Sequence, residues 1–99
     1  MRVVEAQGYG PMSTPAGAAF NKQPDGSSAL WIAVPGVGAA AQMRLDGKTL
    51  TSTAVNGVVS ALIPAAEIAL PRRRWLDVID PVEGMKTKPV PFDITAVQP

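Results

Sequence analysis

The chain has 99 residues, which is enough for one hydrophobic core and too few for two domains. Nine basic and eight acidic residues leave a net charge of +1, so no global field attracts the chain to nucleic acid or to an anionic membrane. Cysteine and histidine are absent, which excludes disulfides, thiolate nucleophiles, the usual zinc sites and proton transfer by histidine.

The distribution of breaker residues predicts the fold class. Ten prolines and nine glycines interrupt the chain, at a spacing of roughly 8 to 12 residues that is typical of short strands and turns in a β-sandwich. No stretch approaches the about 18 to 20 consecutive apolar residues of a membrane helix, and the N-terminus lacks the apolar region of a signal peptide. We therefore expect one domain over residues 1–99, without membrane insertion.

The first third of the chain predicts a strand, a crossover and a hairpin. A strand is expected over Arg2–Gln7, and the following GYGPMSTPAG at residues 8–17 is a breaker-rich crossover through which a strand can switch sheets. Phe20–Gln23 and Ser28–Val34 then read as the two strands of a hairpin, joined by the turn Pro24-Asp25-Gly26.

Trp31 faces away from the core in this interpretation. Leu30, Ile32 and Val34 alternate along their strand and share one face, so Trp31 lies on the other. The Gly8–Pro15 crossover covers the indole in one interpretation, and in the other the ring is exposed and stacks on a sugar or a base.

Two strong hairpin signals occupy the middle of the chain. Ala41–Leu45 and Lys48–Ser52 are predicted strands separated by Asp46-Gly47, and Asn56-Gly57 is a candidate type I′ turn before a strand over Val58–Ile63. Alternate residues of this last strand form two faces, one of which must be core.

The last third predicts one helical turn and two strands. Pro64 to Leu70 has helical propensity, and Pro71 ends the turn. Strands follow at Trp75–Asp80 and Pro89–Ala96, with a turn at Pro81–Gly84 between them. The whole pattern predicts an all-β, immunoglobulin-like β-sandwich of about seven strands with one short helical turn near residues 64–70. The predicted core consists of Leu30, Ile32, Val34, Leu45, Leu62 or its neighbours, Leu76, Val78, Phe92 and Ile94.

The segment NGVVSALIPAAEIALPRRRWLDVIDPVEGMKTKPVPFDI at residues 56–94 resembles the IPT/TIG domains, and Ile63–Ala69 is the closest match. Upstream, Asp46-Gly47 and Thr14–Gly17 resemble the short connections of that family. The resemblance implies an early-set immunoglobulin-like sandwich and, in bacteria, a module attached to a larger exported or surface protein. Members occur in carbohydrate-active enzymes, adhesins and receptor ectodomains, and the family has no catalytic residues to carry over.

Paired carboxylates are the only constellation left for catalysis, and they involve Asp77, Asp80 and Glu83. Asp77 and Asp80 face opposite sides of a strand, because side chains three residues apart alternate in direction. We therefore expect no catalytic residue, no metal and no cofactor.

Arg72, Arg73 and Arg74 are predicted to lie in the loop between the helical turn and the following strand, at one end of the sandwich. Arginine forks bind phosphate, sulfate or uronate oxygens, so the loop is a candidate contact for an anionic glycan, for a neighbouring domain, or for solvent alone. Exposed pairs with Glu67 or Asp77 would contribute only ~0 to 1 kcal/mol, so stability is a poor reason for three arginines in succession.

Trp75 and Ile79 form a half-exposed apolar strip if Leu76 and Val78 point into the core. Burying the Trp75 ring in a partner would contribute about 1.5 to 3 kcal/mol, which justifies a contact with a domain or a glycan. The alternative is that a loop or the stems of Arg72 and Arg74 cover the ring.

We expect a non-catalytic structural or interaction module of a larger bacterial protein that is periplasmic, secreted or at the cell surface. Its partners would be neighbouring domains, another protein or a polysaccharide, and not nucleic acid, which requires a wider basic surface with interleaved aromatics. One alternative is a carbohydrate-binding accessory module that uses Trp75 and the Arg72–Arg74 loop. Another is a dimerising module of an intracellular regulator.

Overall fold

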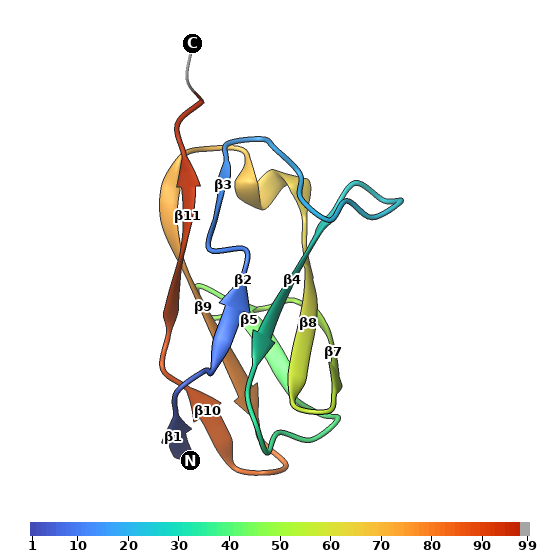
Figure 1. Cartoon of the computed structure of the whole chain (residues 1–99), viewed down its shortest axis with the longest axis vertical. Helices are drawn as coiled ribbons and strands as arrows, with labels where there is room; N and C mark the ends of the chain where they lie inside the picture. The colour runs from blue at the N-terminus through green and yellow to red at the C-terminus, as the bar shows by residue number, and fades with distance from the viewer. Residues whose placement is uncertain (98–99) are drawn as a thin grey trace.

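The computed structural model describes residues 1–97 and shows two β-sheets packed face to face (Figure 1). The all-β sandwich predicted from the sequence is therefore confirmed. The small sheet has four strands, in the spatial order β2 (Gly8–Gly10), β4 (Ser28–Ala33), β8 (Val58–Ile63) and β7 (Thr51–Val55).

The large sheet has seven strands and is centred on β9 (Arg72–Asp80). One edge of β9 pairs with β5 (Gln42–Leu45), which also pairs with β6 (Lys48–Thr49). The other edge of β9 pairs with β10 (Met85–Thr87) and β11 (Val90–Thr95), and these two strands are joined in parallel by β1 (Arg2–Val4) and β3 (Ser13–Pro15) respectively. The small sheet thus holds the A, B, E and D positions of an immunoglobulin-type sandwich, and β5, β9 and β10–β11 hold the C, F and G positions.

The N-terminal segment switches sheets where its breaker residues predicted a crossover. β1 belongs to the large sheet, β2 to the small sheet, and β3 again to the large sheet. The first strand ends at Val4 and is shorter than the predicted Arg2–Gln7. Pro11 follows β2 and Pro15 ends β3, and each of these two strands is three residues long.

The prediction of a strand over Phe20–Gln23 was wrong. That segment makes only an isolated bridge between Lys22 and Ser28, because Asn21 adopts a positive φ of 43° that no regular strand contains. Phe20 turns inward and packs its ring against Phe92, with 5.7 Å between the ring centroids. The segment is therefore a loop that is fixed by one aromatic contact.

Both predicted two-residue hairpins are present with the expected geometry. Asp46 and Gly47 have φ values of 49° and 82°, and Asn56 and Gly57 have 52° and 76°. A positive φ at both central residues defines the type I′ turn, which matches the twist of the flanking strands. These turns set the register of β5 with β6 and of β7 with β8.

One 3₁₀ turn, η1 (Ala65–Ile68), connects β8 to β9 at the position of the predicted helical turn. Nothing helical in residues 1–97 is long and apolar enough to cross a membrane. The loop predicted for the arginine triplet is wrong, because β9 begins at Arg72 and pairs with β11 from Arg72 to Leu76.

The core lies between the sheets and matches the sequence prediction. Leu30, Ile32, Val34, Leu45, Leu76, Val78, Phe92 and Ile94 are all buried. Leu62 is half-buried and faces outward with Val58 and Ser60, while its neighbours Ala61 and Ile63 are buried. The core face of β8 is therefore the one that contains Val59, Ala61 and Ile63.

Candidate functional site

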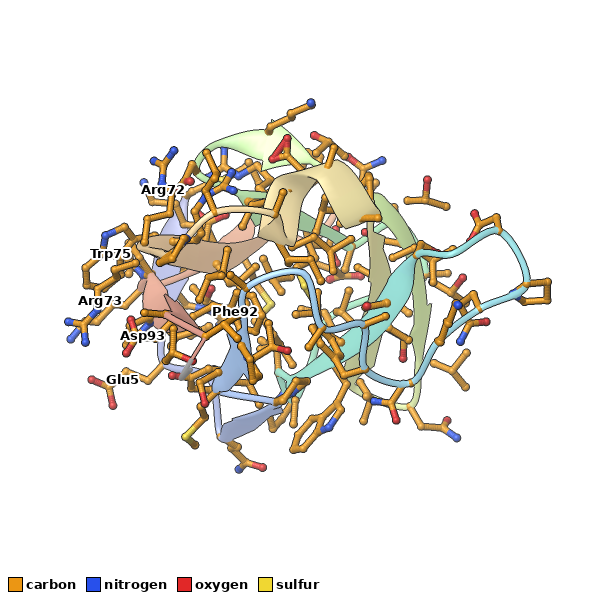
Figure 2. All side chains as sticks on the ribbon, turned by 90° about the horizontal axis from the view of Figure 1, so that it is seen from above. Glu5, Arg72, Arg73, Trp75, Phe92 and Asp93 are labelled. Carbon is orange, nitrogen blue, oxygen red and sulfur yellow. The ribbon has the colours of Figure 1, made fainter. Side chains whose placement is uncertain are left out.

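Strand alternation gives the three consecutive arginines different surroundings. Arg73 projects from the outer face of the large sheet together with Trp75, whereas Arg74 projects inward beside η1 and is buried. Figure 2 shows Arg72, Arg73, Trp75 and Asp93 along one side of the sandwich, with Phe92 inside it. The triplet is therefore not one continuous cationic patch.

Arg74 joins three segments of the chain. Its Nε donates to Oδ2 of Asp46, its Nη1 donates to the carbonyl oxygen of Glu67 at 2.7 Å, and its Nη2 donates to Oε2 of Glu67 at 2.9 Å. Burial acts to lower the pKa of Arg74, but the hydrogen bonds to Asp46 and Glu67 outweigh it and raise the pKa. Arg74 thus fastens η1 and the β5–β6 turn to the start of β9.

Asp46 has a second role beyond its turn. It accepts a hydrogen bond from the backbone N–H of Trp75 at 2.9 Å and lies 3.9 Å from the guanidinium of Arg72. Desolvation acts to raise the pKa of Asp46, but the hydrogen bonds from Arg74 and Trp75 prevail and lower it. Its carboxylate is therefore committed to the structure.

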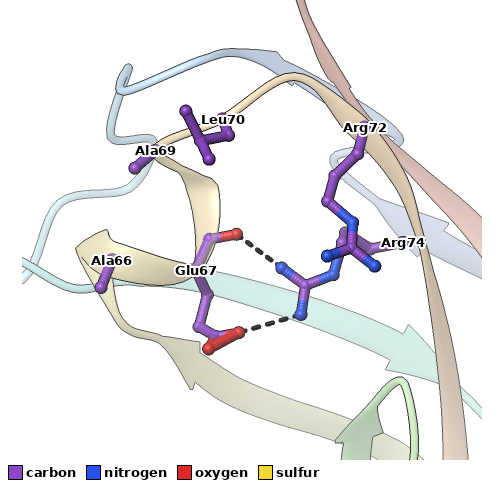
Figure 3. A pocket seen from close by; sticks show the side chains of 6 residues that line it. All are labelled: Ala66, Glu67, Ala69, Leu70, Arg72 and Arg74. Carbon is purple, nitrogen blue, oxygen red and sulfur yellow. Dashed lines mark hydrogen bonds and ion pairs between the residues drawn. The ribbon is translucent and has the colours of Figure 1, made fainter.

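A hollow of about 260 Å³ lies between η1 and the start of β9, as Figure 3 shows. It is lined by Ala66, Glu67, Ala69, Leu70, Arg72 and Arg74. The side chain of Arg72 is 61% exposed and its ion pair with Asp46 is long, at 3.9 Å. Arg72 is thus the arginine of the triplet with the most freedom to meet an external group.

Trp75 lies on the outer face of the large sheet and is 45% exposed. The guanidinium of Arg73 lies 5.8 Å from the centre of the ring, within the range of a cation–π contact. The partial cover predicted from the stems of Arg72 and Arg74 therefore comes from Arg73 instead. Ile79 lies on the same face and is half-buried, as expected from alternation.

Two bidentate ion pairs flank the Trp75 ring. Arg73 binds both carboxylate oxygens of Asp93 at 2.7 and 3.0 Å, and Arg44 binds both oxygens of Asp77 at 2.9 and 2.6 Å. The hydrogen bonds from Arg73 lower the pKa of Asp93. We call this surface the Trp75 face, and define it by Trp75, Ile79, Arg44, Asp77, Arg73 and Asp93.

Sequence reasoning missed Arg44, Asp93 and the role of Asp46. Asp46 was assigned to its turn alone, and the aspartate partners of Arg44, Arg73 and Arg74 are 20 to 33 residues away along the chain. Alternation along each strand indicates that these charged side chains face outward. It does not indicate which strands are neighbours, and so it does not identify the ion pairs.

The three carboxylates that were weighed for catalysis do not form one group, because Asp80 and Glu83 both lie near Gly38 at the turn after β9, whereas Asp77 lies on the outer face of the sheet. Asp77 points outward to Arg44. Asp80 is buried and accepts hydrogen bonds from the backbone N–H groups of Gly38, Val82 and Glu83. The same hydrogen bonds, led by that of Gly38, lower the pKa of Asp80. Asp80 thus fastens the β4–β5 loop to the turn after β9, and within residues 1–97 no three acidic side chains gather at a metal-binding distance.

Comparison with protein-family models found no match for this chain, and comparison with curated proteins found none either.

Proposed function

We propose that the chain is a non-catalytic structural or interaction module that contacts a neighbouring domain of its parent protein, or another protein, through the Trp75 face. The observation that supports this function is a half-exposed indole flanked by two bidentate ion pairs that are formed within the chain. The IPT/TIG resemblance supports an immunoglobulin-like module of a larger bacterial protein that is periplasmic, secreted or at the cell surface.

The paired charges make this face suitable for a protein contact. Burying an unpaired charge in an interface is costly, because the charge loses its hydration. Arg44 and Arg73 avoid part of this cost, because each already binds both carboxylate oxygens of an aspartate in the same chain. Burying the remaining exposed part of the Trp75 ring contributes about 1 to 3 kcal/mol. Tryptophan and arginine are also the residues most enriched at the energetic centres of interfaces.

Carbohydrate binding by Trp75 and the arginine triplet is the second candidate for this face. Arg72 is available to an anionic sugar, because its side chain is 61% exposed and its ion pair is long. Arg73, however, lies over the ring on which a sugar would stack, and the fork of Arg74 is occupied by Asp46 and Glu67. The contacts therefore favour the protein partner.

Hydroxyl-radical footprinting tests the proposal by comparing the isolated 99-residue chain with the full-length parent protein. Trp75 is expected to oxidise several-fold more slowly in the parent, because a neighbour covers its ring. Trp31, which is 43% exposed on the opposite sheet, is the matched internal reference. Equal oxidation of Trp75 in both samples would rule out a domain contact at this face.

A further inference from the structure

The outer face of the small sheet carries no charge. The strands β2, β4, β7 and β8 contain no lysine, arginine, aspartate or glutamate. The side chains that project outward from them are small, hydroxylated or apolar: Ala29, Trp31, Ala33, Thr51, Thr53, Val55, Val58, Ser60 and Leu62. This composition is the opposite of the Trp75 face, where four of the six defining residues are charged.

Trp31 lies flat on this sheet because two glycines leave room for its ring. Gly10 pairs directly with Trp31, and a Cβ atom at Gly10 would lie only 2.9 Å from Nε1 of the indole. A Cβ atom at Gly8 would lie 3.7 Å from Cη2 and Cζ3, at the other end of the ring. The predicted crossover thus covers one side of Trp31, and the 43% exposure of the residue places the other side in solvent.

A shallow hollow of about 180 Å³ lies on the same face, on the other side of β4 from the indole. Its lining includes the hydroxyl-bearing residues Thr51, Thr53 and Ser60. Ser60 is the cross-strand partner of Trp31, so the hollow begins one strand away from the ring. We call the indole and this hollow the Trp31 face, defined by Trp31, Gly8, Gly10, Thr51, Thr53 and Ser60.

The hollow continues toward the 3₁₀ turn. Thr51 and Leu62 also line a second hollow of about 120 Å³, whose far side is formed by Pro64 and by the ion pair of Lys48 with Glu67. Two adjoining hollows give the face an elongated shape that suits a segment of a polymer better than an isolated small molecule.

The size and the charge of the face decide between occupants. Three strands of five to six residues and one of three residues, at about 4.8 Å spacing and about 3.3 Å per residue, give a footprint of roughly 300 Å², well below the ~800 Å² per partner of a stable complex between two separate proteins. The four strands carry no cation, and Lys48, which lines the second hollow, already forms an ion pair with Glu67 at 3.8 Å, so the face offers little to a polyanion. A short segment of a neutral glycan matches both properties.

We propose that the Trp31 face binds a neutral polysaccharide, with one sugar ring stacked on the exposed side of the indole. The apolar C–H face of a sugar packs on an aromatic ring, and its hydroxyl groups exchange hydrogen bonds with Thr51, Thr53 and Ser60. This site goes beyond the proposed function, because it lies on the opposite sheet and uses none of the residues of the Trp75 face.

Affinity electrophoresis of the 99-residue chain tests the site, in native gels that contain soluble starch, mixed-linkage β-glucan or galactomannan. At least one of these neutral polysaccharides is expected to retard the chain. Trp31→Ala is expected to weaken binding roughly tenfold through the lost stacking surface. Gly10→Ala displaces the indole from its seat and is expected to weaken binding in the same gel, whereas Trp75→Ala should migrate like the wild type.

Ser60→Leu provides an independent variant, because it fills the hollow and leaves the indole in place. It too is expected to reduce retardation, and an unchanged urea midpoint would show that each variant remains folded. The proposal is overturned if none of the three polysaccharides retards the wild type, or if Trp31→Ala binds as well as the wild type. It is also overturned if Trp75→Ala alone abolishes binding, or if sedimentation shows a dimer that Trp31→Ala dissociates. Footprinting of Trp75 in the parent protein tests the Trp75 face, whereas the gels test the Trp31 face. The proposed protein contact and the proposed polysaccharide site can therefore fail independently.

Discussion

Alanine substitution of each consecutive arginine is expected to produce very different losses of stability. Arg74→Ala removes three hydrogen bonds, one of them to a backbone carbonyl and two to carboxylates, from a side chain that is 10% exposed. Removing one partner of a fully buried ion pair costs about 3 to 5 kcal/mol. Asp46 and Glu67 remain 30% and 24% exposed and regain some hydration in the variant. We therefore expect a loss of about 2 to 3 kcal/mol for Arg74→Ala.

The two preceding arginines supply matched controls in the same strand. The side chain of Arg73 is 56% exposed and that of Arg72 is 61% exposed, so solvent replaces most of what an alanine removes. Both substitutions are expected to leave the urea midpoint close to that of the wild type. Urea unfolding followed by far-UV circular dichroism, with an unchanged slope across the series, measures all three variants on one scale.

Arg74→Met separates the guanidinium from its aliphatic stem. Methionine retains the packing of the stem and leaves the two carboxylates without their cation. If the ion pairs provide the stability, Arg74→Met loses about as much as Arg74→Ala. Recovery of wild-type stability in Arg74→Met, or equal losses at positions 72 and 74, would refute the assignment of Arg74 as the link between η1, the β5–β6 turn and β9.

Three further outcomes are expected. The hydrogen bonds of Arg74 lower the pKa of Asp46, against desolvation, and also lower the pKa of Glu67. The stability from these carboxylates is complete above their unfolded pKa values of about 4 and is lost as the pH falls through their lower folded pKa values. In Arg74→Met, the free energy of unfolding should therefore fall less steeply between pH 6 and pH 2 than in the wild type. Asp80→Ala removes the acceptor of three backbone N–H groups, so hydrogen exchange at Gly38 should accelerate and the melting temperature should fall, whereas unchanged exchange would contradict the anchoring role. Gly57→Ala forces a side chain onto a φ of 76° and is expected to cost about 1 to 2 kcal/mol in urea unfolding, with no change in midpoint arguing against strain at this turn.

Local signals predicted the parts of the fold that depend on a few adjacent residues. The Asp-Gly and Asn-Gly pairs specify a positive φ at both turn positions. The alternation along β9, with its inward face taken from the IPT/TIG resemblance, correctly placed Leu76 inward and Trp75 outward. Neither prediction needs knowledge of a distant strand.

The arginine triplet was misplaced because its structure depends on distant partners. A run of three cations after Pro71 has low intrinsic strand propensity and reads locally as a loop. The strand forms because β11 pairs with it, and Asp93 lies directly opposite Arg73 in that register. Sequence alone does not show which strand becomes the neighbour, so the charge compensation that supports the start of β9 could not be predicted.

The glycines at positions 8 and 10 illustrate a second limit of sequence reasoning. They read correctly as strand breakers, and β2 is indeed only three residues long. They also allow the indole of Trp31 to pack against the backbone, which depends on the pairing of Gly10 with Trp31. A glycine in a strand marks a close approach of some group, but the sequence does not identify the group.

The Trp75 face is charged and the Trp31 face is not, because different groups surround the two indoles. Trp75 has ion-paired side chains on its own and neighbouring strands, so its surroundings are polar and their charges are paired within the chain. Trp31 rests on bare backbone, which exposes a full ring face but brings no charge with it. Stacked sheets are separated by about 10 Å, so a partner on one face does not obstruct the other. The two proposals are therefore compatible, because a protein neighbour on the large sheet would leave the small sheet open to a neutral polymer.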